Sequence, residues 1–263
     1  MVVRFIIACA VLAESVALAA LPLPEHVKPD GPQQAVIYSE HTGSADVGMG
    51  DAMVKTCQGM CASKVFPQPC RIEGNAQRHG EYVRRTWRTA NASTNYTETW
   101  ALLPSEPGDI CTMRLQLMRT LRIETSDGRE STLLSIDLER GEGTRRVVKR
   151  RSVADGDPER ALQALLATGY QRAGTGRYAG YACRLLRRTA GELVQEACLL
   201  EDSAAPASAL GVPVQHMTLA HSMVNPAHPE ARTHGETHLL TFNASVPAAV
   251  FTPPTNIRWK NLK

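Results

Sequence analysis

The chain of 263 residues has few aromatic side chains, only 5% of the total, so aliphatic residues must supply most of its core. No segment approaches the ~20 consecutive apolar residues of a transmembrane helix, which predicts a protein that does not span a membrane. The net charge of +3 is small for this length, and no nucleic-acid partner is expected. Hydrophobic residues at 43% and charged residues at 21% are typical of a globular protein.

Motifs that identify common enzyme families are also missing. The chain contains no G-x-S-x-G, S-x-x-K or P-loop pattern, each of which places a nucleophile or a phosphate cradle at a fixed spacing. The sequence therefore predicts a protein that is not an enzyme and that carries no cofactor.

The N-terminus has the pattern of a secretory signal peptide. Arg4 supplies a short basic region, residues 5–13 form a brief apolar run, and residues 17–19 match an A-x-A cleavage signature. A buried or amphipathic N-terminal helix is the alternative. We expect residues 1–20 to be a signal peptide and the mature protein to be periplasmic or secreted.

The cysteines fit an oxidising compartment. Loss of the signal peptide would remove Cys9 and leave six of the seven cysteines, enough for three disulfides. We expect two of these among Cys57, Cys61, Cys70 and Cys111, with the connectivity left open. A zinc site is the alternative for these four, although their spacing departs from the usual C-x2-C pairs.

The third disulfide is predicted from a hairpin. Two strands are expected over 181–188 and 192–200. A two-residue loop at Ala190-Gly191 would place Cys183 directly opposite Cys198. Directly opposite positions are close enough for a disulfide, so we expect a bond between these two cysteines.

A second hairpin is predicted over residues 112–138. Apolar and polar residues alternate with a period of two, and Asp127-Gly128 is a turn signal. A two-residue turn there brings the apolar faces of both strands together. Arg119 falls on this apolar face, where either a bulge turns it outward or its charge points inward.

One helix follows these strands. Asp157 is a suitable N-cap, Pro158 suits the first turn, and Gly169 suits the end of the helix. We divide the chain into the signal peptide, a Pro-rich lead-in with a cysteine-rich segment over 21–80, and a β-rich domain over 81–263. The predicted fold class is α+β, with a large curved antiparallel sheet, an unclosed β-barrel, packed on one or a few helices.

Several short motifs resemble periplasmic proteins with the lipoprotein-carrier (LolA/LolB-like) fold. They lie at residues 120–128, 134–138, 179–184 and 249–254. The resemblance implies an apolar cavity between sheet and helix, and a non-enzymatic carrier of an acyl-chain ligand or a lipoprotein. The expected cavity lining is Leu115, Leu117, Leu121, Ile123, Leu134, Ile136, Leu162, Leu165 and Leu166.

Two other functions remain open. The densest run of positive charge predicts a contact patch for an envelope protein partner, as in an interaction or stress-sensor module; it comprises Arg145, Arg146, Lys149, Arg150 and Arg151. A metal-linked or redox-linked envelope protein is the third hypothesis. For it, alternation on a strand places His234, Glu236 and His238 on one face, where they would be candidate metal ligands.

Overall fold

The computed structural model describes residues 33–62, 68–89, 91–149, 158–201, 208–209, 212–213, 217–246 and 248–261. The signal peptide predicted at residues 1–20 lies outside this part of the chain, as do Arg150 and Arg151 of the predicted contact patch. None of the helices in the described residues is long and apolar enough to cross a membrane.

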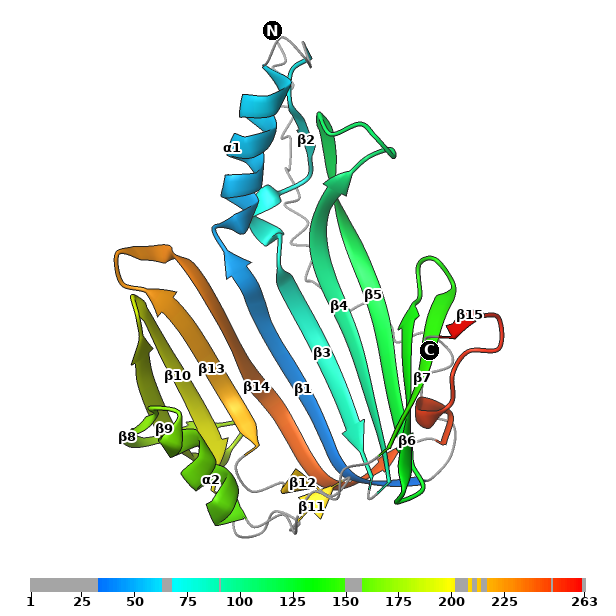
Figure 1. Cartoon of the computed structure of the whole chain (residues 1–263), viewed down its shortest axis with the longest axis vertical. Helices are drawn as coiled ribbons and strands as arrows, with labels where there is room; N and C mark the ends of the chain where they lie inside the picture. The colour runs from blue at the N-terminus through cyan, green and yellow to red at the C-terminus, as the bar shows by residue number, and fades with distance from the viewer. Residues whose placement is uncertain are drawn as a thin grey trace, which may run out of the picture.

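One curved, open sheet of 13 strands dominates the molecule (Figure 1). Its strands follow one another in space in the order β15 (Arg258–Asn261), β7 (Glu142–Lys149), β6 (Glu130–Asp137), β5 (Thr112–Ser126), β4 (Ala92–Pro104), β3 (Glu81–Arg88), β1 (Gln33–Val47), β14 (His228–Val246), β13 (Thr218–Asn225), β10 (Leu193–Leu200), β9 (Tyr181–Ala190) and β8 (Gln171–Tyr178). The thirteenth strand, β2 (Arg71–Glu73), pairs with β5. A separate two-stranded ribbon joins β11 (Ser208–Ala209) to β12 (Val212–Pro213).

The predicted α+β class is wrong, because the fold is dominated by its sheet. The described residues contain two α-helices, α1 (Met49–Cys61) and α2 (Pro158–Ala167), and two short 3-10 helices, η2 (Ala76–Arg78) and η3 (Ala248–Phe251). The sheet is also mixed and not purely antiparallel, since β15 runs parallel to β7 and β2 runs parallel to β5. Helix α2 confirms the predicted helix, but its leucines contact only the β9–β10 end of the sheet.

Sequence analysis missed the first strand and the first helix. Strand β1 lies between β3 and β14, so part of the predicted lead-in is a central strand of the sheet. Helix α1 starts after Gly48, whose N-cap position provides no side-chain hydrogen bond. It presents Cys57 and Cys61 to a buried cluster, where they form disulfides with Cys70 and Cys111.

All three predicted disulfides are present, and they define the connectivity. Cys57 bonds to Cys70, Cys61 to Cys111 and Cys183 to Cys198, with Cα–Cα distances of 5.7, 5.7 and 5.4 Å. The zinc alternative is therefore excluded for these cysteines.

Both predicted hairpins exist, but each register differs from the prediction by two residues. Leu121 lies opposite Ile136, and Cys198 lies opposite Leu185, so the disulfide joins Cys198 to a diagonal neighbour. In each hairpin the loop is centred one residue later than predicted. Glycine occupies the first central position with a positive φ, as in a type II′ turn: φ is 94° at Gly128. A shift of two residues leaves every side chain on its predicted face.

Candidate functional site

The structure does not bring the nine predicted cavity residues together. Leu121 and Ile136 are buried in a cluster with Val250 of η3, which covers one face of β4, β5 and β6. Leu162 packs instead against Leu186 and Leu199 in a separate cluster on β9 and β10, near the other end of the sheet. Some of these side chains are thus buried beneath η3, and others are buried beneath helix α2. Both groups belong to the protein core. The sequence pattern had identified core residues and not a shared ligand cavity.

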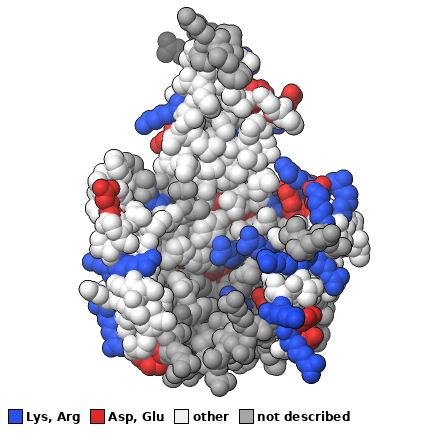
Figure 2. Space-filling view, viewed as in Figure 1, with Lys and Arg blue, Asp and Glu red and all other residues white. Residues whose placement is uncertain are grey.

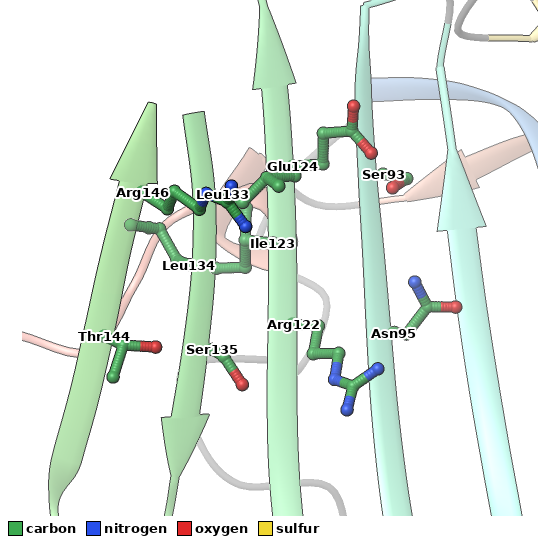
Figure 3. Close-up of a pocket in the computed structure, with 10 residues that line it drawn as sticks. All are labelled: Ser93, Asn95, Arg122, Ile123, Glu124, Leu133, Leu134, Ser135, Thr144 and Arg146. Atoms are coloured by element: carbon green, nitrogen blue, oxygen red, sulfur yellow. The ribbon is translucent and has the colours of Figure 1, made fainter. Parts of the chain in front are cut away.

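A pocket of about 410 Å³ does occur on the sheet, on β4, β5, β6 and β7 (Figure 3). Seven of its ten lining residues are polar, and the lining consists of Ser93, Asn95, Arg122, Ile123, Glu124, Leu133, Leu134, Ser135, Thr144 and Arg146. Two guanidinium groups, three hydroxyl groups, one amide and one carboxylate therefore share the pocket with an aliphatic surface. These polar groups need hydrogen-bonding partners, which a hydrophilic ligand supplies and an acyl chain does not.

Strand register explains why these side chains meet. In the first row of directly paired residues, Arg122 lies opposite Asn95 on one side and Ser135 on the other. In the next row, Glu124 lies opposite Ser93 and Leu133. Directly opposite residues share a face of a sheet, so two rows of residues form one polar surface.

The other face of the same strands is apolar and covered. Tyr96 and Leu121 are fully buried there beside Val250, whose carbonyl accepts a hydrogen bond of 2.9 Å from the Thr94 hydroxyl. Alternation along β4 and β5 therefore separates a core face, closed by η3, from the face that carries the pocket. The strict period of two in this part of the sequence reflects that division.

The pocket holds positive charge that the described residues leave uncompensated. Arg122 and Arg146 are exposed and make no hydrogen bond or ion pair with any described residue. Glu124 interacts electrostatically with Arg88; burial lowers the pKa of that guanidinium, and the carboxylate acts against the decrease. Figure 2 shows Lys and Arg side chains gathered over the half of the molecule that carries β5 to β7. The two unpaired arginines make the pocket attractive to an anion.

The predicted contact patch is divided by the pleat of β7. Arg146 belongs to the pocket, whereas its neighbour Arg145 lies opposite Leu134 and so belongs to the other face. Lys149, at the end of the strand, is exposed. One member of the predicted patch is therefore part of the site, and Arg145 provides a natural control for it.

The predicted metal ligands do not converge. His234, Glu236 and His238 are all exposed on β14, and His238 Nε2 lies 3.2 Å from Glu40 Oε2. Within the described residues, no group of three or more His, Cys, Asp or Glu side chains is arranged to hold a metal ion. The described structure therefore gives no support for a metal site at His234, Glu236 and His238.

A different histidine cluster lies where β1, β3, β13 and β14 meet. The His41 ring stacks on His221 with a centroid distance of 5.5 Å, and His41 Nε2 lies 3.1 Å from the Tyr82 hydroxyl. His41 Nδ1 lies 3.2 Å from the Thr237 hydroxyl. The cluster fits because Gly235 lies beneath it: a Cβ there would be only 2.4 Å from His41 Nε2.

This cluster holds neutral imidazoles. Burial, followed by the nearby His221 and Arg84, lowers the pKa of His41 to about 4, and burial also lowers the pKa of His221. Sequence analysis could not find the cluster, since 180 residues separate its two histidines and no local motif joins them. The glycine at position 235, between two polar residues of a strand, was the one available signal of a close approach.

Comparisons with known proteins add little to this geometry. No family model and no curated protein matches the chain. It is similar to a solved structure of PNGF-II in space group C2, with a TM-score of 0.37 and 10% identity over 87% of this chain and 31% of that chain. For the P21 form the TM-score is 0.36, with 8% identity over 88% of this chain and 32% of that chain. The chain thus spans about a third of the length of PNGF-II, and these scores carry no argument about activity. Its own fold and site define a sheet-dominated, disulfide-bonded protein with a polar, cationic pocket.

Proposed function

We propose that the protein is an exported, non-enzymatic binding protein that holds anionic ligands or partners on the polar face of β4 to β7. The observation that carries this proposal is the pair of exposed arginines, Arg122 and Arg146, that line one pocket without a partner among the described residues. Arginine is the side chain best suited to carboxylates and phosphates, because its planar guanidinium donates several hydrogen bonds at once.

The three disulfides support export. Such bonds persist in the periplasm and outside the cell and are rare in the cytosol. The pocket is also built on paired strands of a disulfide-bonded sheet. Backbone pairing between the strands fixes the position of each lining residue. We therefore place the function in the periplasm or outside the cell.

The acyl-chain ligand expected from the sequence remains untested, and the described residues favour a polar ligand over it. Native mass spectrometry distinguishes the two. Mature protein purified from its own compartment would carry a hydrophilic anion, or nothing, under the present proposal. A bound lipid of a few hundred daltons, released on denaturation, would instead support the carrier hypothesis.

The binding experiment uses a charge-neutralised variant. Wild type and Arg122→Gln/Arg146→Gln are compared on beads that carry a carboxylated or phosphorylated polymer and on beads that carry neutral dextran. We expect the double variant to lose about tenfold or more in affinity for the anionic beads, because each charged hydrogen bond contributes about 1.5–3 kcal/mol.

The matched control uses single substitutions: Arg146→Gln removes one charge from the pocket, and Arg145→Gln removes the same charge from the same strand on the opposite face. Equal losses in these two single variants would mean that only net charge matters. Such a result would refute a site in the pocket. If wild-type protein ignored every anionic bead, the proposed function itself would be wrong.

A further inference from the structure

We infer that the pocket of β4 to β7 recognises an acidic saccharide, that is, a short sugar chain bearing carboxylate groups. This inference rests on the proposed function and specifies its ligand. Three properties of the lining carry it: the two guanidinium groups that have no partner among the described residues, the neutral hydrogen-bonding groups of the lining, and an aliphatic surface beside them.

The guanidinium groups belong to different strands and stand apart. Arg122 is on β5 and Arg146 on β7, with β6 between them and an offset of two residues along the strands, so their backbones are about 12 Å apart at a strand spacing of about 4.8 Å and a rise of about 3.4 Å per residue. Figure 3 shows Arg122 reaching towards Asn95, whereas Arg146 reaches across β6 towards β5. A ligand that satisfies both therefore extends along the pocket and carries its anionic groups apart from each other.

The groups between the arginines suit hydroxyls. Ser135 and Thr144 lie directly opposite each other on β6 and β7, and each hydroxyl can both donate and accept a hydrogen bond. Glu124 accepts only, so it favours the hydroxyls of a sugar and repels a bare phosphate or sulfate.

The apolar part of the lining is aliphatic. Leu133 is partly exposed in the pocket, where it can contact the C–H face of a sugar ring. None of the large hydrophobic side chains exposed among the described residues lines the pocket, so nothing there suits insertion into a membrane. The volume of about 410 Å³ is in the range of small-ligand sites.

The test compares three probes by calorimetry on the intact protein: trigalacturonate, the neutral maltotriose, and inorganic phosphate. We expect trigalacturonate to bind at least about tenfold more tightly than either of the others, because only it meets both kinds of group. Equal affinity for trigalacturonate and phosphate would overturn the saccharide inference but leave anion binding, and thus the proposed function, intact. No binding of any probe, together with no retention on anionic beads, would refute both.

A neutral variant isolates the hydroxyl contacts. Ser135→Ala/Thr144→Val keeps every charge and removes the directly opposed hydroxyl groups of β6 and β7 from the pocket lining. We expect about a tenfold loss for trigalacturonate and no change in retention on phosphorylated beads. Thr125→Ala, an exposed threonine on β5 outside the pocket lining, is the control. An unchanged affinity of the double variant for trigalacturonate would contradict the assignment.

Discussion

The histidine cluster makes the stability of the protein depend on pH in a way that one substitution can isolate. The neutral His41 ring is stacked between Tyr82 and His221, with centroid distances of 5.9 and 5.5 Å. Burial first, and then the nearby charges, lowers the pKa of His41 from 6.5 to about 4. The unfolded chain therefore takes up a proton at this residue at a higher pH than the folded protein does.

The sign follows from that difference. Well above pH 6.5 the ring is neutral in both states, and the difference in pKa does not affect the free energy of unfolding. As the pH falls from about 6.5 to about 4, only the unfolded state gains the proton, so the free energy of unfolding decreases. The full difference corresponds to about 3 kcal/mol. Because the ring is partly exposed and screened by solvent, we expect about half of that.

Urea denaturation at pH 7.0, 6.0, 5.0 and 4.5 measures this contribution. We expect wild type to lose about 1–2 kcal/mol more across this range than His41→Gln does, because the carboxylates and His221 titrate in both proteins. The exposed His234→Gln variant is the control and should follow wild type. Parallel curves for wild type and His41→Gln would refute the reasoning, whatever the absolute stability of the variant.

Three further predictions concern stability. Tyr96→Phe removes a 2.9 Å hydrogen bond from a buried hydroxyl to the buried Glu98 carboxylate, and we expect a loss of about 1.5–3 kcal/mol in urea denaturation. Gly59→Ala, within α1 where a Cβ would meet open space, should stabilise the protein by about 1 kcal/mol, seen as a higher melting temperature. Replacing both Cys183 and Cys198 with alanine should cost about 3 kcal/mol, because that disulfide closes a loop with a sequence separation of 15.

Each of these has a clear contrary outcome. An unchanged urea midpoint for the tyrosine variant would show that the buried carboxylate finds another donor. A lower melting temperature for the glycine variant would show that α1 needs its backbone freedom at that position. A Cys183→Ala/Cys198→Ala variant as stable as wild type would mean that this disulfide does not restrict the unfolded chain, contrary to the loop-closure argument.

Local signals in the sequence identified much of the structure. Helix α2, both hairpins and the Cys183–Cys198 disulfide follow from caps, alternation and cysteine spacing, each of which acts over a few residues. The sequence also predicted two further disulfides, but not which cysteines they join. The positions of the turns were one residue off, because glycine takes the first central position of each loop and not the second. Arg119 remains on its predicted face without a bulge and forms an ion pair with Glu139.

Strand β1 was missed because it is central. Ile37 and Ser39 are buried on one face, while Glu40 on the other face forms an ion pair with the buried Arg85, so neither face has a simple apolar pattern. Helix α1 lacks a side-chain cap and contains two glycines, which weakens its local signal. The spacing of Cys57 and Cys61, one helical turn apart, is compatible with a helix, but it was interpreted only as part of a disulfide cluster.

The candidate site was less predictable than the fold. Its polar residues come from four strands, and they meet only through pairings that a sequence pattern does not reveal. The prediction instead assigned the cavity to the apolar face of the β5–β6 hairpin. In the structure η3, including Val250, covers that face, which is part of the core. Of the members of the predicted patch that the structure describes, Arg146 alone lines the pocket.

The most direct test of the account is a two-dimensional amide NMR titration of the protein with trigalacturonate. We predict shifts concentrated at Arg122, Ser135, Thr144 and Arg146, and their loss in the Arg122→Gln/Arg146→Gln variant. Shifts confined to helix α2 and the strands beneath it, or spread evenly over the basic surface, would contradict a binding site in the polar pocket.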